Sequence, residues 1–219
     1  MRVFVISSAV TALLGGVAIA RAQATGAKVW DFQSDALNGP PAGFSFGRTG
    51  QGREGRWVVV DDTTAPSRDQ VLAQLDQDKA DYRFPIAVAD APSLKDLRLE
   101  VHCKPVSGKI DQACGILFRY RDPDNYYVAR ANALEDNVNL YQVVRGRRRQ
   151  VKGWSGKVAT STWHALAIEA RGDRLQVFWE GKPIIDAKDD TLRDAGKVGI
   201  WTKADSVTYF DALTATPLG

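Results

Sequence analysis

Long helical patterns are missing from this sequence, and their absence argues against helical bundles and α/β folds. No stretch with a helical period exceeds three turns, and the best helical candidate is the short segment Asp69–Asp76. The remaining sequence alternates between apolar and polar residues with a period of two, and turn-forming residues interrupt this pattern at short intervals. Many short strands without helices between them predict an all-β sandwich or barrel.

Beyond its N-terminus the sequence has no apolar run long enough to cross a bilayer, so no membrane span is expected. Residues 1–24 contain Arg2, then a mildly apolar run, then the small residues of Ala22-Gln23-Ala24. This is the pattern of a signal peptide that is cleaved after Ala24, and an uncleaved anchor is the alternative. Residues 25–219 are then expected to form a single exported domain, either periplasmic or secreted.

That domain carries little net charge, which argues against nucleic acid as its partner. The whole chain has a formal charge of +3, and loss of the two arginines before Ala24 leaves 27 basic and 26 acidic residues. A near-neutral domain has no overall field to attract a polyanion. The basic run Arg145-Gly146-Arg147-Arg148-Arg149 is therefore interpreted as a solvated turn, with contact to anionic glycan or lipid headgroups as the alternative.

Cysteine and histidine are scarce, with two of each in 219 residues. His102 and Cys103 are consecutive in a strand pattern, so their side chains point to opposite faces and do not easily share a zinc ion. If segments 97–104 and 114–121 are the two arms of a hairpin, Cys103 and Cys114 can form a disulfide in an oxidising compartment. Two separate buried thiols are the alternative, and the sequence does not decide between them.

What the sequence does contain is a series of strand and turn motifs in a characteristic order. Strand GILFRYR, turn DPDN and strands YYVARAN and NVNLYQV are followed by W-H-x-L-x-I-E, G-D-R-L-x-V-F-W-E-G-K, G-K-V-G-I-W-T-K and Y-F-D-x-L. This order resembles the concanavalin A-like lectin/glucanase superfamily over residues 97–213, and is most similar to laminin-G-like domains and bacterial 3-keto-disaccharide hydrolase-like domains. The resemblance implies a two-sheet antiparallel jelly roll with a sugar-binding groove on the concave face of its bent sheet.

Several of these strands pair one apolar face with one face of polar and aromatic residues. If the polar faces all point the same way, they form a floor that consists of Arg119, Arg130, Asn132, Asn139, Tyr141, Trp201 and Lys203. Arginine and asparagine offer planar hydrogen-bonding groups to sugar hydroxyls, and tyrosine and tryptophan rings stack on sugar C–H faces. We expect these residues to bind carbohydrate, and an ordinary solvated sheet face is the alternative.

Signatures of familiar hydrolases are absent. The sequence lacks the E-x-D-x-x-E strand that carries the carboxylates of laminarinase-type glycosidases, and it lacks G-x-S-x-G. The 3-keto-disaccharide branch carries the motifs N-S-G-[IL] and D-H-G. The corresponding segments here, 113–116 and 202–205, read A-C-G-I and T-K-A-D and so depart from both motifs.

Because these signatures are absent, a non-catalytic glycan-binding domain is the first hypothesis, and a 3-keto-glycoside hydrolase or lyase is the second. In the second case the base would be Glu135, Asp205, Asp211 or His164. An inert envelope protein is the third hypothesis.

No cofactor is expected, and Ca²⁺ is the one alternative. Asp122-Pro123-Asp124-Asn125 is rich in oxygen ligands, and the resemblance implies that a Ca²⁺ site is feasible there. The same four residues are also typical of an ordinary turn that holds no ion, and this is the preferred interpretation.

Overall fold

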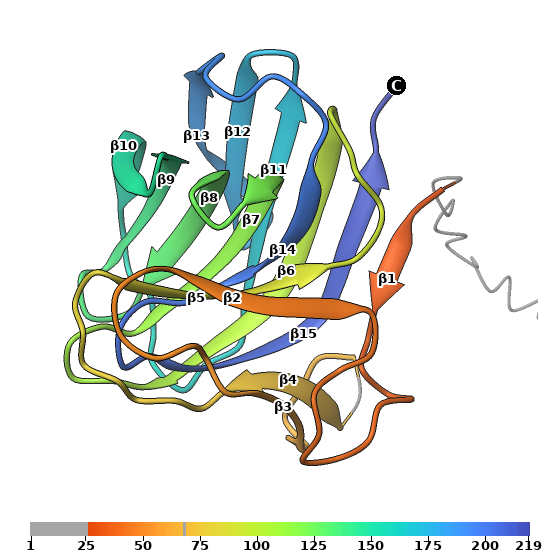
Figure 1. The fold of residues 1–219 in the computed structure, drawn as a ribbon, viewed down its shortest axis with the longest axis vertical. Coiled ribbons are helices and arrows are strands. Elements are labelled where there is room, and N and C mark those ends of the chain that lie inside the picture. The colour runs from red at the N-terminus through yellow and green to blue at the C-terminus, as the bar shows by residue number, and fades with distance from the viewer. Residues whose placement is uncertain (1–25, 68) are drawn as a thin grey trace, which may run out of the picture.

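The computed structural model describes residues 26–67 and 69–219, and in these residues it contains two antiparallel β-sheets (Figure 1). The predicted signal segment lies outside the described residues. One sheet has the order β13 (Lys182–Lys188), β12 (Arg174–Trp179), β11 (His164–Arg171), β6 (Leu97–Ser107), β15 (Val207–Pro217), β4 (Gln70–Gln74) and β3 (Trp57–Asp61), with β1 (Lys28–Trp30) also paired to β15. The other has the order β10 (Arg147–Ser155), β9 (Asn137–Val144), β8 (Asn125–Asn132), β7 (Ala113–Asp122), β14 (Lys197–Trp201), β5 (Arg83–Ala89) and β2 (Phe44–Gly50). The predicted two-sheet sandwich is confirmed.

The main core lies between the two sheets and follows from the two-residue period of the strands. In β6, Leu97, Leu99, Val101 and Cys103 are fully buried, and the residues between them are partly exposed. In the facing sheet the same core takes Cys114, Ile116 and Phe118 from β7, together with alternate residues of β8 and β9. Burial of one face of each strand accounts for the packing of the two sheets.

The helix predicted over Asp69–Asp76 is wrong, because this segment contains strand β4. Val71, Leu72 and Ala73 are all fully buried, and β4 pairs with β3 on one side and β15 on the other. A strand that is covered on both faces loses the alternating pattern and becomes a short apolar run. Such a run cannot be distinguished from a helix by periodicity alone.

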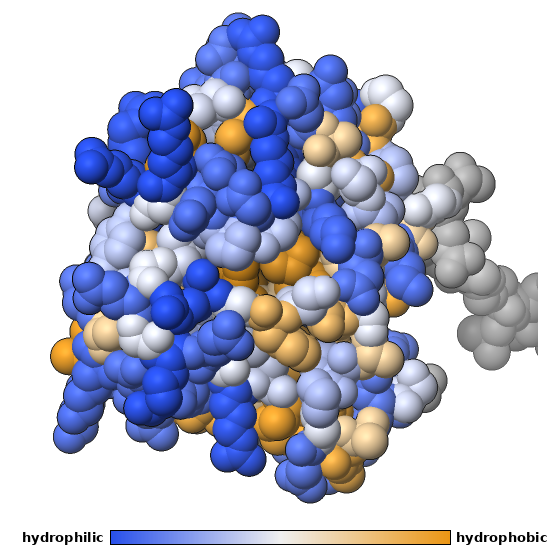
Figure 2. All heavy atoms as spheres, in the orientation of Figure 1, coloured by the Kyte–Doolittle hydropathy of each residue, from blue (hydrophilic) through white to orange (hydrophobic). Residues whose placement is uncertain are grey.

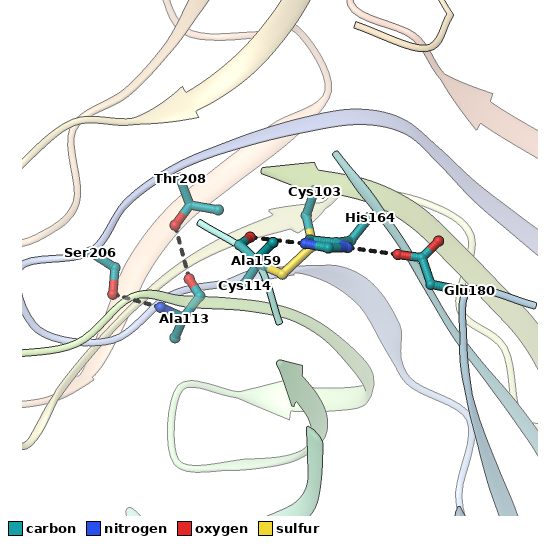
Figure 3. Close-up of a disulfide and its surroundings, with 8 residues drawn as sticks. All are labelled: Cys103, Ala113, Cys114, Ala159, His164, Glu180, Ser206 and Thr208. Atoms are coloured by element: carbon teal, nitrogen blue, oxygen red, sulfur yellow. Dashed lines mark hydrogen bonds and ion pairs between the residues drawn. A yellow bond between two sulfur atoms is a disulfide. The ribbon is translucent and has the colours of Figure 1, made fainter. Parts of the chain in front are cut away.

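Cys103 and Cys114 are bonded, but residues 97–104 and 114–121 are not the two arms of a hairpin. The two segments belong to β6 and β7, which lie in different sheets. The disulfide therefore crosses the core with a Cα–Cα distance of 6.2 Å and connects the two layers (Figure 3). Its presence is typical of proteins that fold in an oxidising compartment.

The surface is largely hydrophilic on the face seen in Figure 2, where apolar side chains gather in a smaller central patch. In the described part of the chain, no helix has the length and the apolar character that a bilayer crossing requires.

Candidate functional site

The seven-stranded sheet buries side chains on both of its faces. The face turned away from the main core carries a second cluster of buried residues, which consists of Phe84, Ile86, Val88, Ala113, Leu117, Tyr126, Val128, Tyr141, Val143 and Trp201. Strand alternation places Arg130 and Asn132 on this same face of β8, opposite Asn139 and Asn137 of β9. Polar and aromatic groups therefore share one surface of this sheet.

This surface is concave, as one arginine shows. The guanidinium carbon of Arg148 lies 4.5 Å from the ring centroid of Tyr141 on β9 and 4.6 Å from that of Phe84 on β5. In a flat sheet β9 and β5, which are four strand spacings apart, would be separated by about 19 Å. Side chains stand roughly perpendicular to a sheet, so both rings reach one guanidinium only because the sheet bends toward this side. We call this surface the concave face.

Arg130 is the centre of a first polar cluster on the concave face. Its guanidinium donates hydrogen bonds to Glu135 Oε2 at 3.1 Å, to Asn137 Oδ1 at 3.1 Å and to the Tyr141 hydroxyl at 2.7 Å. Asn139 Nδ2 donates to the same hydroxyl at 3.0 Å. Arg130 is only 2% exposed, whereas the Glu135 side chain is 48% exposed. The cluster thus presents a carboxylate to solvent on a rigid, buried support.

The charge of Arg130 also determines the ionisation of Glu135. Partial burial alone would raise the pKa of Glu135, but the Arg130 charge and the hydrogen bonds from Asn137 and Arg130 outweigh burial and lower the pKa. Glu135 is therefore ionised at neutral pH. It accepts hydrogen bonds well and is a weak base.

Lys203 and Asp111 form a second polar cluster next to the first. Lys203 Nζ lies 2.6 Å from Asp81 Oδ1 and 2.9 Å from Asp111 Oδ2. The Asn132 side-chain amide donates through Nδ2 to Asp111 Oδ1 at 2.9 Å, and its Oδ1 accepts the backbone N–H of Glu135 at 3.3 Å. Asn132 therefore connects the two clusters.

Asp111 and Lys203 are both largely buried, and burial acts on their pKa values in opposite directions. Burial raises the pKa of Asp111 more strongly than the Lys203 charge lowers it. Burial alone would lower the pKa of Lys203, but the carboxylates of Asp81 and Asp111 raise it. Lys203 is therefore a permanent cation in this cluster.

Among the predicted floor residues, Arg119 is in the wrong place. It lies in a β-bulge of β7 with a φ of 49°, and the bulge changes the alternation of the strand. Its buried guanidinium donates to the carbonyls of Lys95, Leu192 and Gly172, away from the concave face. Arg119 therefore supports loops at the end of the sandwich.

Trp201 lies on the expected face, but its ring is not available to a ligand. The residue is fully buried, it stacks on Phe84 at a centroid distance of 5.1 Å, and its indole N–H donates to the Tyr126 hydroxyl. Gly115 makes room for this ring, because a Cβ there would lie 3.1 Å from Trp201 Cε3. The expected stacking surface is thus already part of the packing.

Asp81, Asp111 and Arg148 also belong to the concave face, although the sequence did not predict them. The two aspartates lie outside the strands, and only the chain fold brings them to Lys203, so no local pattern signals them. Arg148 was interpreted as part of a solvated turn, but it lies on β10 opposite Val143, whose side chain belongs to the concave face. The alternation of strand residues could therefore have predicted that Arg148 lies on the concave face.

Three other candidate bases have structural roles. His164 lies on β11 of the opposite sheet, where its ring contacts Glu180 Oε1 at 2.6 Å and the Ala159 carbonyl at 2.9 Å (Figure 3). Asp211 accepts hydrogen bonds from the backbone N–H and hydroxyl of Ser67. Asp205 accepts the backbone N–H groups of Lys109, Ile110 and Asp111 at 2.8–3.1 Å. Of the four candidate bases, Glu135 alone belongs to the clusters of the concave face.

The role of Asp205 leads to a prediction for stability. Burial by itself would raise its pKa, but the three backbone N–H donors outweigh burial and lower the pKa below the usual range of an aspartate. Its contribution to stability is therefore present above the unfolded-state pKa and is lost as the pH falls through the folded-state pKa. We expect Asp205→Asn to lower the free energy of unfolding by about 2 kcal/mol at pH 7.

Urea denaturation at pH 7, 5 and 3 measures this effect. The difference between wild type and Asp205→Asn is expected to shrink as the pH falls below about 4. Asp190→Asn, at an exposed surface ion pair, is the control and is expected to change little. A destabilisation that is the same at all three pH values would contradict the hydrogen-bonding role of the carboxylate.

The segment proposed for Ca²⁺ forms a turn that is closed by its own side chains. Asp122 Oδ1 accepts the backbone N–H of Asp124 at 2.8 Å and the side-chain N–H of Asn125 at 2.9 Å. Within residues 26–67 and 69–219, no group of three or more His, Cys, Asp or Glu side chains is arranged to hold a metal ion. The Asp122 carboxylate is thus already used within its own turn, and these contacts do not fit a calcium site.

Comparisons with known proteins place this geometry in a structural context. No family model matches the chain. Levanase of Bacillus subtilis (strain 168) is 23% identical over 161 residues, which make up 72% of this chain and 22% of levanase, so the chain spans about a fifth of that protein.

Solved structures give the more extensive likeness. Carbohydrate binding module CBM66 from Bacillus subtilis aligns with a TM-score of 0.64 and 20% identity, over 80% of this chain and 95% of the module. Bacillus licheniformis beta-glucanase aligns with a TM-score of 0.58 and 12% identity, over 90% of this chain and all of that one. The fold of this chain is thus the two-sheet jelly roll of the concanavalin A-like lectin/glucanase type.

Proposed function

We propose that this chain is an exported, non-catalytic domain that binds a glycan at the polar clusters of its concave face. One observation carries the proposal: a buried, hydrogen-bonded Arg130 supports the half-exposed carboxylate of Glu135, beside the Asp111–Lys203 pair. Adjacent sugar hydroxyls donate to carboxylates and accept from cationic N–H groups, so fixed pairs of opposite charge suit them. The residues that we propose for this site are Arg130, Asn132, Asn139, Tyr141 and Lys203, with Glu135 and Asp111 added. The half-exposed Glu135 carboxylate contacts the glycan directly, and the more buried residues hold it in place and line the site.

Two likenesses support carbohydrate as the ligand class. The jelly roll is shared with a carbohydrate binding module and a beta-glucanase, and the finer resemblance to laminin-G-like and 3-keto-disaccharide hydrolase-like domains points to the same class. Because a relative is named levanase, fructans are the first glycans to test. The Cys103–Cys114 disulfide supports the periplasm or the exterior of the cell as the location.

Glycoside cleavage is the second candidate function, and one observation favours it. Glu135 is an acid with a half-exposed side chain on the concave face, where a base for a 3-keto-glycoside hydrolase or lyase would be needed. However, its lowered pKa makes it a poor base, and the second acid, Asp111, is buried in an ion pair with Lys203. Binding without cleavage therefore fits the described side chains better.

The test is a glycan array probed with residues 25–219, followed by calorimetry on each hit. The array includes levan, other neutral polysaccharides, uronate-containing polysaccharides and 3-keto-glycosides. We expect binding to a restricted set of glycans without release of smaller sugars. Absence of binding to every glycan would refute the proposal, and release of sugar from a 3-keto-glycoside, lost in Glu135→Gln, would establish the second function.

A further inference from the structure

Arg148 covers the aromatic side chains of the concave face, and it is not among the glycan-binding residues proposed above. Its guanidinium carbon lies 4.5 Å from the ring centroid of Tyr141, 4.6 Å from Phe84 and 5.7 Å from Trp201. Three rings from β9, β5 and β14 thus surround one cation. Arginine stacks well on aromatic faces, because its planar charge is weakly hydrated.

The rings are the main partners that the structure gives to this guanidinium. Nη1 of Arg148 is buried and has no hydrogen-bond partner among the described residues. The ion pairs of the described chain include Arg130 with Glu135, Lys203 with Asp81 and Asp111, and Arg149 with Asp189, but none to Arg148. Arg130, Lys203 and Arg149 are thus paired with carboxylates, whereas Arg148 is held by π faces.

The backbone around Arg148 is fixed by Tyr82. The Tyr82 hydroxyl accepts the backbone N–H of Arg148 at 2.7 Å and donates to the Gly146 carbonyl at 2.9 Å. The Tyr82 ring in turn packs against Phe84 at a centroid distance of 4.7 Å. This bridge joins the β9–β10 turn to the segment before β5, and holds the guanidinium over the rings.

We propose that Arg148 is a specificity-determining residue, which occupies the place where a ligand would otherwise stack on Tyr141, Phe84 and Trp201. This inference rests on the proposed glycan-binding function. The Arg148 side chain confines the ligand to the polar clusters around Arg130 and Lys203. It thereby selects a compact, hydroxyl-rich sugar unit that is held by hydrogen bonds. Removal of the guanidinium leaves an aromatic cage that accepts a small organic cation or the C–H face of an additional sugar.

The experiment compares wild type with Arg148→Ala and uses Arg147→Ala as the matched control. Arg147 precedes Arg148, is exposed and points to the other side of β10, so its removal changes the charge equally without touching the rings. Each protein, labelled with ¹⁵N, is titrated with tetramethylammonium, and the indole N–H signal of Trp201 is followed by NMR after assignment with Trp201→Phe.

In Arg148→Ala we expect a saturable shift of the Trp201 signal, with an affinity for tetramethylammonium at least tenfold above that of wild type and Arg147→Ala. For any glycan that the wild type binds, oligosaccharides longer than the minimal unit are expected to gain roughly three- to tenfold in affinity in Arg148→Ala.

Two results would overturn the proposal. One is a folded Arg148→Ala in which the Trp201 signal responds to tetramethylammonium no more than in wild type. The other is a selectivity among glycans that is unchanged in this variant. If Arg148→Ala does not fold, Arg148→Gln, which removes the guanidinium and shortens the side chain, is measured in the same way. A wild type that binds no glycan refutes the proposed function, whereas the tetramethylammonium titration, which needs no glycan, decides separately whether Arg148 fills the cage.

Discussion

Arg130→Ala is expected to weaken glycan binding at least 100-fold. The guanidinium of Arg130 holds Glu135, Asn137 and Tyr141 in one arrangement while being almost fully buried itself. Its loss removes a cationic donor, frees the Glu135 carboxylate and leaves the Tyr141 hydroxyl with Asn139 as its remaining donor. Truncation of one member of a buried, hydrogen-bonded charge pair at a binding site costs about 2–5 kcal/mol, and 100-fold corresponds to about 2.7 kcal/mol.

The comparison variants separate binding from folding. Arg130→Lys keeps the charge but loses the planar fork, so an intermediate loss of about tenfold is expected. Arg174→Ala, at an exposed ion pair with Asp186 on the opposite sheet, should bind like the wild type. Calorimetry measures affinity, and circular dichroism with thermal melting verifies the fold of each variant. A folded Arg130→Ala with an affinity within threefold of wild type would exclude the Arg130 cluster as the binding site.

Strand alternation was sufficient to predict one half of the concave face. On β8 and β9 the two-residue period is regular, so Arg130, Asn132, Asn139 and Tyr141 lie on one face as the sequence predicts. On β7 the same rule fails, because the bulge beyond Phe118 adds residues to one strand only and turns Arg119 away. No glycine marks this bulge, so the sequence gives no local warning of it.

The other half of the concave face depends on sheet order, which a single strand does not encode. Lys203 follows β14, and β14 lies between β7 and β5, so the loops that carry Asp111 and Asp81 meet at this lysine. The placement of β6 and β7 in different sheets was missed for the same reason. Their apolar faces look alike whether the strands are neighbours in one sheet or face each other across a core.

The burial of Trp201 shows that composition alone is a poor guide to a binding surface. An outward face rich in arginine and aromatic residues was expected to present its rings to a ligand. Here the bend of the sheet brings the rings together, and Arg148 covers them. The groups that the concave face offers to a ligand are consequently paired charges, and this follows from the bend of the sheet, which composition does not reveal.

Removal of the disulfide with the pair Cys103→Ala and Cys114→Ala is expected to lower the free energy of unfolding by about 3 kcal/mol. The cysteines are 11 residues apart in sequence, and the chain-entropy relation for a closed loop of about this length gives that value. For a domain of this size the melting temperature should fall by about 6–12 °C. Thermal and urea unfolding of the double variant, and of wild type with and without reductant, measure the effect.

Because this bond joins β6 and β7 across the core, whereas the Arg130 and Lys203 clusters lie on the other face of the β7 sheet, the double variant should keep its glycan affinity below its melting temperature. The two variants are thus expected to affect different properties. The disulfide variant has a lower free energy of unfolding, and Arg130→Ala has a lower glycan affinity. A double variant as stable as wild type would mean that packing between the sheets suffices without the bond. A double variant that is folded but no longer binds would mean that the curvature of the concave face depends on the link between the two layers.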